Sequence, residues 1–274
     1  MKVAMLGSGS GGNATVVLGE KTRILVDAGF SGRQIAERLD RIGVEPASVD
    51  AVVVTHEHRD HTRGIGVFSR RFGTPLYLTP GTREACASLL RGEEPTRDYS
   101  PGSPFRVGDL RIDPFLTAHD AVDPVAVTVT STACGTRLGI ATDLGRPTTG
   151  IRHALERCDF LVLESNYDES LLRSGPYPAS VQARIASSHG HLSNHAAAGL
   201  ACELLHPRLV GIFLAHLSRK CNCPVLARRV VRDALKGAGW NGFLEVVEQD
   251  EPTALVDVRR LHARREHGQL SLFT

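Results

Sequence analysis

Short apolar runs rich in β-branched residues recur along the chain, and such runs are typical of buried strands. The run from Val49 to Thr55 is nearly unbroken and has the length of a strand. Amphipathic stretches alternate with these runs; in the first, Ser31 can cap a helix that continues to about Ile42, where Gly43 stops it. The expected strands are 3–6, 15–18, 23–27, 49–55, 75–79, 113–117, 125–130, 137–142, 158–163, 209–215, 243–247 and 254–258.

The order of helices among these strands predicts the architecture. The expected helices are 31–42, 64–72, 80–91, 179–187, 194–206 and 225–236. Strands, helix and strands follow one another twice, which favours two sheets packed face to face with helices outside. This is a four-layer αββα sandwich of the α/β class. No linker divides residues 1–258, so we expect one domain there, followed by a mobile basic tail over 259–274.

Metal-ligating side chains are concentrated directly after the 49–55 strand. The hexapeptide His56-Glu57-His58-Arg59-Asp60-His61 places four candidate ligands within six positions, on an expected loop at the edge of a sheet. Imidazole suits Zn, Fe and Ni, whereas carboxylate suits harder ions such as Mn. A mixed set this dense can hold two metals, and two metals about 3.5–4 Å apart form a clamp for hydrolysis, especially of phosphate esters.

Three more candidate ligands, His119, Asp143 and His216, each follow an apolar strand. Strand ends meet at a common rim of an α/β scaffold, where catalytic groups gather. Each residue alone is as often structural as functional. Together with the hexapeptide they make a set of seven.

The order H-x-H-x-D-H, then His, Asp and His, resembles the metallo-β-lactamase superfamily over about residues 1–258. Further motifs are similar to those of its YycJ/WalJ-like branch, which implies a 5′→3′ DNA exonuclease or a related phosphodiesterase. These motifs are Gly7-Ser8-Gly9-Ser10-Gly11-Gly12-Asn13, Leu25-Val26-Asp27-Ala28-Gly29, Thr55-His56-Glu57-His58, His119-Asp120-Ala121, Glu164-Ser165-Asn166-Tyr167-Asp168, Gly190-His191-Leu192-Ser193-Asn194 and His216-Leu217-Ser218.

The resemblance implies a dinuclear site with two divalent ions, Zn or Mn, between which the sequence does not choose. The implied ligands are His56, His58 and His119 for the first ion, Asp60, His61 and His216 for the second, and Asp143 as the bridge. Asp60 would also steer the nucleophilic water or accept its proton. Asp27 would hold a ligand imidazole in its orientation; the alternative is a turn residue at a strand end.

Contacts to substrate are expected at the 190–194 motif and after His216. The first precedes a predicted helix, whose free N–H groups can hold a phosphate, and His191 would donate to that phosphate as a catalytic residue. The alternative is that Ser193 or Asn194 only caps the helix. The substrate-binding candidates are His191, Ser193, Asn194, Ser218, Arg219 and Asn222.

The roles of two further segments stay open, since each has two interpretations. The glycine-rich loop 7–13 lacks the lysine of a P-loop and precedes a strand, so it is either a loop near the active centre or a plain turn. Cys221 and Cys223 flank Asn222, where the branch tends to have paired Asn. A thiol there can bind metal or be oxidised, but we favour small inert residues.

Composition narrows the classes of function. The chain has 274 residues, 42% of them hydrophobic, and a net charge of +2, which does not by itself indicate nucleic acid. Its beginning lacks the apolar run of a signal peptide, and no stretch has the length of a membrane span. We therefore expect a cytoplasmic protein with reduced thiols, without membrane attachment, which argues against a secreted β-lactamase.

The last residues resemble the peptide by which bacterial replication and repair proteins dock on the sliding clamp. Leu272 and Phe273 would fill an apolar pocket, Leu270 a neighbouring subsite, and Gln269 would anchor the peptide by hydrogen bonds. Upstream arginines at 259, 260, 264 and 265 would attract DNA phosphates. The alternative is that this end folds back onto the domain.

The leading hypothesis is a metal-dependent DNA exonuclease in repair or replication, with DNA as substrate and the clamp as partner. Arginines near the hexapeptide support a phosphate substrate; they are Arg59, Arg63, Arg70 and Arg71. The alternatives are a thioester, lactone or β-lactam hydrolase on the same fold, an RNA-processing nuclease, and a clamp-bound adaptor with a vestigial site.

Overall fold

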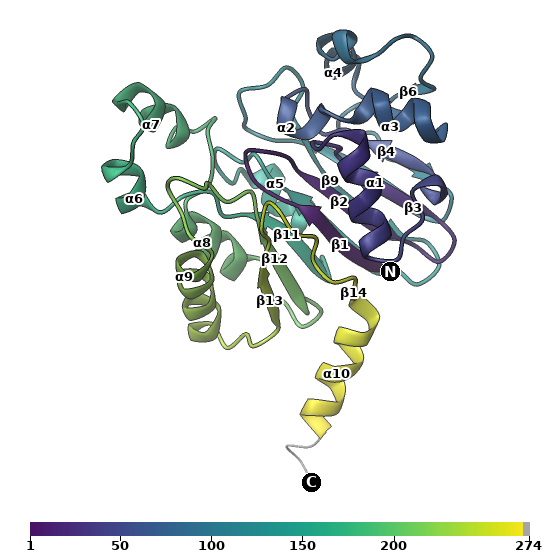
Figure 1. Ribbon diagram of the computed structural model, residues 1–274. Coiled ribbons are helices and arrows are strands. Elements are labelled where there is room, and N and C mark those ends of the chain that lie inside the picture. The colour runs from purple at the N-terminus through teal and green to yellow at the C-terminus, as the bar shows by residue number, and fades with distance from the viewer. Residues whose placement is uncertain (271–274) are drawn as a thin grey trace.

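The computed structural model describes residues 1–270, with the side chains of residues 1–265, and within this range two seven-stranded sheets face each other (Figure 1). The first sheet has the order β14 (Val256–Asp257), β1 (Lys2–Gly7), β2 (Ala14–Leu18), β3 (Arg23–Val26), β4 (Ala51–Val53), β5 (Leu76–Leu78), β6 (Thr96–Asp98). The second has the order β13 (Phe243–Val246), β12 (Gly211–Ala215), β11 (Phe160–Glu164), β10 (Arg137–Ala141), β9 (Val125–Ser131), β8 (Leu110–Leu116), β7 (Phe105–Val107).

Helices cover the outer faces of the two sheets, which confirms the predicted αββα sandwich. On the first sheet lie α1 (Gly32–Arg41), α2 (Arg59–Thr62), α3 (Ile65–Phe72), α4 (Pro80–Ala85) and the short 3-10 helices Pro46–Ser48 and Ala87–Leu89. The second half of the chain contains α5 (Thr149–Leu155), α6 (Glu169–Ser174), α7 (Ala179–Ile185), α8 (Asn194–Glu203), α9 (Pro224–Gly237) and α10 (Val258–Leu270). No helix in residues 1–270 combines the length and apolarity needed to cross a membrane.

The core follows from the two-residue period of the strands. In β1, Val3 and Met5 face the second sheet, whereas Ala4 and Leu6 pack under the helices of the first. The strands of the second sheet behave alike, since Phe213 joins the central core and Leu214 packs under α8 and α9. Apolar side chains therefore fill three interfaces, one between the sheets and one under each helical layer.

Parallel strands bring the candidate site residues to one rim. In the second sheet β10, β11 and β12 run parallel, so the residues that follow them are neighbours. In the first sheet β3 and β4 run parallel, which places Asp27 beside the hexapeptide. Gly29 permits close contact there, because a Cβ at this position would lie 1.6 Å from the carbonyl oxygen of Asp60.

Two segments differ from the sequence-based expectation. The second half of the hexapeptide is not a loop, because Asp60 and His61 lie on the short helix α2. The tail after residue 258 begins as the helix α10, although it has few core residues. Leu261 packs against the central core, and the guanidinium of Arg265 donates to the carbonyl oxygen of Leu209 at 2.9 Å. These contacts, which the charged composition hid, hold the start of the tail against the domain.

The residue after the C-cap of α5 provides a test of backbone strain. Arg157 is exposed and has φ of +60°, the left-handed conformation that costs an L-residue roughly 1–2 kcal/mol. Arg157→Gly should therefore raise the free energy of unfolding by about 0.5–1 kcal/mol, after the entropy cost of glycine is subtracted. Denaturant titration measures the change. Arg157→Ala, which keeps the Cβ, should give no gain; equal stability of the two variants would contradict the interpretation.

Candidate metal centre

The rim where the strands end has an unusual backbone. Asp27, Asp143 and His216 follow β3, β10 and β12 and have φ of 64°, 59° and 58°. Non-glycine residues rarely adopt positive φ, and such strain persists where the surrounding structure imposes it, often at functional sites. Three such residues at one rim indicate a geometry that the fold maintains against a local cost.

One cluster of imidazoles comes from the hexapeptide and the loop after β8. His56, His58 and His119 each offer a nitrogen within 4.8 Å of the others. The Nδ1 atom of His56 lies 3.0 Å from the Thr55 hydroxyl, and Nδ1 of His119 lies 3.1 Å from the carbonyl oxygen of Gly190. Because these outward contacts engage Nδ1, the Nε2 atoms of both rings are left for a ligand.

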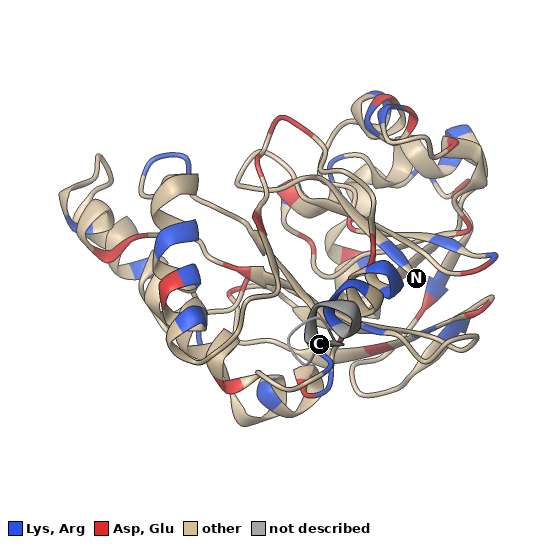
Figure 2. Ribbon diagram, turned by 90° about the horizontal axis from the view of Figure 1, so that it is seen from below, with Lys and Arg blue, Asp and Glu red and all other residues tan. Residues whose placement is uncertain are grey.

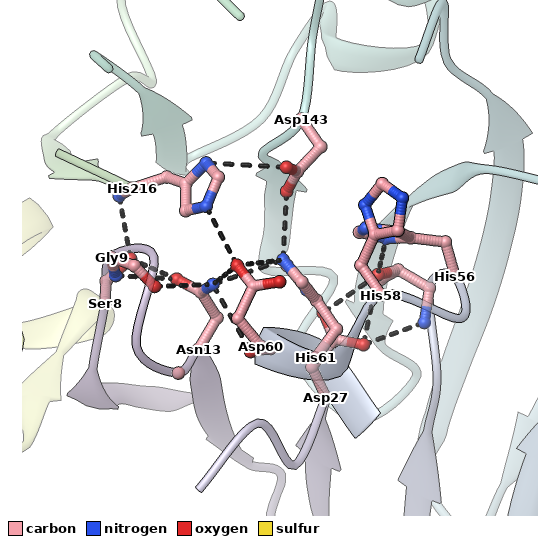
Figure 3. Close-up of polar contacts among 12 residues, drawn as sticks. Ser8, Gly9, Asn13, Asp27, His56, His58, Asp60, His61, Asp143 and His216 are labelled. Atoms are coloured by element: carbon pink, nitrogen blue, oxygen red, sulfur yellow. Dashed lines mark hydrogen bonds and ion pairs between the residues drawn. The ribbon is translucent and has the colours of Figure 1, made fainter. Parts of the chain in front are cut away.

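A second cluster contains one carboxylate and two imidazoles. Asp60, His61 and His216 offer ligand atoms within 4.8 Å of one another. Oδ2 of Asp60 lies 3.3 Å from Nε2 of His216 and 3.6 Å from Nε2 of His61. Figure 3 shows these side chains meeting from α2 and from the end of β12.

Asp143 lies between the two clusters (Figure 3). Its Oδ2 is 3.1 Å from Nε2 of His61, and its Oδ1 is 3.6 Å from Nε2 of His119 and 3.4 Å from Nδ1 of His216. The structure thus brings together all seven side chains that the sequence singled out. The placement of Asp143 is that of a group able to contact ions in both clusters.

Two buried carboxylates behind the clusters orient the imidazoles. Oδ2 of Asp27 lies 2.7 Å from Nδ1 of His61, and its carboxylate also accepts hydrogen bonds from the Thr55 amide and hydroxyl. Oε1 of Glu164 lies 2.8 Å from Nδ1 of both His191 and His216. Such outer contacts fix the tautomer and orientation of a ligand imidazole.

Glu164 is a functional candidate that the sequence reasoning missed. Its Oε2 accepts hydrogen bonds from the amides of Leu144 at 2.8 Å and Leu192 at 3.0 Å, so both carboxylate oxygens are engaged. The signal was present, because Glu164 is the last residue of a buried strand and Asp143 follows another one closely. Its role depends on the spatial neighbourhood of His191 and His216, which are far away in the sequence.

The glycine-rich loop also contributes to the site, in agreement with the first of the two interpretations left open. The side-chain nitrogen Nδ2 of Asn13 lies 3.2 Å from Oδ2 of Asp60 and 3.1 Å from Nε2 of His61. The Ser8 hydroxyl accepts a hydrogen bond from the backbone amide of His216 at 2.7 Å. The glycine-rich loop therefore links the hexapeptide to the end of β12 by direct hydrogen bonds.

The charges of the cluster suit a cation site. Burial alone would raise the pKa of Asp143, but the imidazoles of His216 and His61 outweigh it and hold that pKa well below its usual range. Burial would lower the pKa of His61, but Asp143 and Asp27 raise it well above its ordinary value. For His56, burial prevails and lowers the pKa. Asp143 therefore stays ionised, as a metal ligand must be.

The donor atoms pass a direct test of fit for metal. Among the described side chains, Nε2 of His56 and Oδ2 of Asp143 are buried without a hydrogen-bond partner, although Nε2 of His61 lies 3.1 Å from this Oδ2 as an ion-pair contact. Buried polar atoms almost always have partners. A cation in contact with these two atoms supplies the missing interaction, and each cluster has the imidazole and carboxylate donors that Zn and Mn accept.

The clusters open into a cavity of about 250 Å³. Ser10, Gly190 and His191 line its walls, with side chains of α7 on the far side. Arg184 of α7 pairs with Asp120 at 2.5 Å across this opening. His191 is the substrate-binding candidate that faces the cavity, with its Nδ1 held by Glu164 and its side chain 21% exposed.

Four other substrate-binding candidates are buried, and hydrogen bonds within the protein engage them. Ser193 caps α8 by accepting from the amide of Ala196. Asn194 is fully buried and bonds Ser165 and Asn222. The amide of Asn222 donates to the carbonyl oxygens of residues 165 and 166, and Ser218 accepts from the amide of residue 221.

Arg219 and the two cysteines lie outside the metal cavity. Arg219 is exposed, pairs with Asp250 at 2.5 Å and lines a neighbouring cavity. Cys221 is fully buried against Tyr167 and Leu172, as a small apolar residue would be. Within residues 1–265, neither Cys221 nor Cys223 belongs to a group of potential metal ligands.

The candidate clamp-binding side chains lie outside the described residues. Residues 271–274, with Leu272 and Phe273, lie outside the described residues, and so do the side chains of Gln269 and Leu270.

The chain is similar to two bacterial proteins along most of its length. It is 33% identical to the exodeoxyribonuclease YycJ of Bacillus anthracis over 252 residues, 90% of this chain and 94% of the relative. It is 34% identical to the exodeoxyribonuclease WalJ of Streptococcus pneumoniae serotype 2 over 265 residues, 94% of this chain and 98% of the relative.

The comparison with solved structures agrees with these sequence similarities. The metallo-beta-lactamase fold protein YhfI of Bacillus subtilis superposes with a TM-score of 0.70 at 18% identity, over 92% of this chain and 98% of that structure. The family model of the beta-lactamase superfamily domain matches residues 22–212. The chain therefore belongs to the metallo-β-lactamase superfamily, in the branch that contains YycJ and WalJ.

Proposed function

We propose that this protein is a metal-dependent phosphodiesterase that degrades DNA from the 5′ end, in repair or replication within the cytoplasm. The observation that carries the proposal is the position of Asp143 between two ligand clusters, each with at least two imidazoles. Two neighbouring cations are the arrangement that hydrolyses phosphate esters in many nucleases. The names of the two relatives, both exodeoxyribonucleases, support DNA as the substrate.

In this proposal His56, His58 and His119 hold one Zn or Mn ion, Asp60, His61 and His216 hold the second, and Asp143 contacts both. Such a pair of ions, when bound, lowers the pKa of a water molecule and neutralises charge on the phosphoryl oxygens. Asp27 and Glu164 keep the imidazoles of His61 and His216 in place by their hydrogen bonds to Nδ1.

Two side chains remain for proton transfer and substrate contact. Asp60 is partly exposed at the cavity, so its second oxygen can orient the attacking water and accept its proton. His191 faces the same cavity with Nδ1 held by Glu164, which directs the other ring nitrogen toward substrate. From there it donates a hydrogen bond to a phosphate oxygen, which gains charge during the reaction.

Removal of metal tests the proposal directly. Dialysis against a chelator should abolish hydrolysis of 5′-labelled DNA, and added Mn or Zn should restore it. Asp143→Asn should lower kcat by about a hundredfold or more, because one neutral amide cannot serve two cations. Asp40→Asn, a change of the same type on the exposed face of α1, should leave activity intact.

An assay on several substrates, with identification of the products, tests which reaction the protein catalyses. End-labelled single- and double-stranded DNA, RNA and a thioester are offered to the metal-loaded protein. Release of nucleotides from the 5′ end of DNA supports the proposal. Preferential cleavage of RNA or of the thioester would replace it, and inactivity on all substrates with bound metal verified would favour an adaptor.

Glu164 is expected to act as a positioning residue. In Glu164→Gln, the amide nitrogen must oppose either two backbone N–H groups or two imidazoles, so the contacts to His191 and His216 weaken. Metal affinity should fall roughly 10–100-fold, as measured by competition with a chromogenic chelator. Glu156→Gln on the surface is the matched control. Unchanged metal affinity and unchanged kcat in Glu164→Gln would rule out this role.

The C-terminal peptide Gln269-Leu270-Ser271-Leu272-Phe273 is proposed to dock on the bacterial sliding clamp. Basic segments lie along α10, which leads to this peptide (Figure 2). Leu272→Ala combined with Phe273→Ala should abolish clamp binding in calorimetry, because the apolar anchors are lost. Hydrolysis of a small phosphodiester should persist in this variant. Clamp affinity that survives the double change, or deletion of residues 268–274, would refute the docking.

A further inference from the structure

A second cavity lies beside the metal cavity, and Ser10 lines both. Its volume of about 330 Å³ falls at the lower end of the range for small-ligand sites, which suits a group about the size of one nucleotide. None of the residues assigned above to metal binding lines it. The cavity therefore provides space next to the reaction centre that the proposed chemistry does not use.

The wall of this cavity is rich in cations. Arg63, Arg219 and Lys220 are exposed and line it, whereas Asp250 is a single exposed carboxylate that pairs with Arg219. A fourth cation, Arg38, is buried and donates to backbone carbonyl oxygens, so its charge is already engaged. The accessible charges thus leave a positive excess, which attracts phosphate.

The segments that carry candidate metal ligands also carry these cations. Arg63 follows His61 by two residues, at the C-terminal end of α2. Arg219 and Lys220 follow His216 by three and four residues, after β12. Because each segment lines both cavities, a strand whose phosphate lies at the metal clusters can place its next phosphate near these cations.

An aromatic ring completes the cavity. Tyr177 is half-buried in its wall, and the ammonium group of Lys220 lies 5.0 Å from the centroid of the ring. Aromatic rings beside a basic groove are the usual platform for the bases of single-stranded nucleic acid, because every base can stack.

We infer that this second cavity binds the nucleotide adjacent to the scissile phosphate of a single DNA strand. The base stacks on the face of Tyr177 that Lys220 covers in this structure, and Lys220 turns to hold the phosphate together with Arg63. The inference rests on the proposed nuclease function and specifies how the strand leaves the metal centre.

The phosphate contacts are tested with Arg63→Ala combined with Lys220→Ala. The Kd for a fluorescent oligothymidylate should rise roughly tenfold at moderate salt, and the slope of log Kd against log salt should fall by about 0.7 per lost phosphate contact. The matched control, Arg97→Ala with Arg229→Ala, removes the same charge from exposed positions outside both cavities and should change neither quantity.

The stacking contact is tested at Tyr177. Tyr177→Leu should weaken oligothymidylate binding roughly tenfold, and Tyr177→Phe, which keeps the ring, should restore it. If the phenylalanine variant does not restore binding, the proposed stacking of a base on Tyr177 is wrong.

A small substrate separates this inference from the proposed function. Bis(p-nitrophenyl) phosphate has one diester and no adjacent nucleotide, so its hydrolysis by the metal-loaded parent tests the metal centre alone. Oligothymidylate affinity equal to that of the control would overturn the inference even if hydrolysis persists. Absence of hydrolysis by the metal-loaded parent would instead overturn the proposed function. The binding measurements would still show whether the second cavity binds a nucleotide.

Discussion

The buried carboxylate of Asp143 is the charge around which the site is organised. Isolated burial of an ionised carboxylate is very unfavourable, so the fold must surround it with compensating groups. Imidazoles from both halves of the chain do so, at 3.1 Å for His61 and 3.4 Å for His216. The same dense arrangement leaves two atoms of the ligand set without a hydrogen-bond partner, which is the property expected of a cation site.

Asp143 can be held this way because both sheets reach the rim. Asp27 supports His61 from the first sheet, and Glu164 supports His216 from the second. The glycine-rich loop joins them, since Ser8 bonds the backbone of His216 and Asn13 bonds Asp60. A change in the packing between the sheets therefore alters the distances between candidate ligands. The apolar core thus helps to keep these ligands at the spacing that the site needs.

The two cavities at the rim indicate how the protein could distinguish a polymeric substrate from a small ester. The metal cavity accommodates the reacting phosphate, and the neighbouring cavity presents cations and an aromatic ring to the adjoining part of a polymer chain. Fold alone does not specify substrate, because the same scaffold supports many hydrolases. Selectivity must come from loops such as those that carry Arg63 and Lys220.

The sequence by itself determined the sandwich and the set of seven ligand candidates. Both are encoded locally, in the two-residue period of the strands and in polar residues that follow them. Helix α1 was likewise predicted closely from the cap Ser31 and the stop Gly43, and the structure adds Gln34 as the second member of a capping box.

Only the tertiary structure decided which polar residues support the site and which stabilise the fold. Glu164 and Asn194 are both buried polar residues within recognisable motifs, yet the first orients two imidazoles and the second only bonds Ser165 and Asn222. Their roles depend on partners between 27 and 52 residues away. Such pairings are set by how β11, β12 and α8 pack together, which the local pattern of residues does not specify.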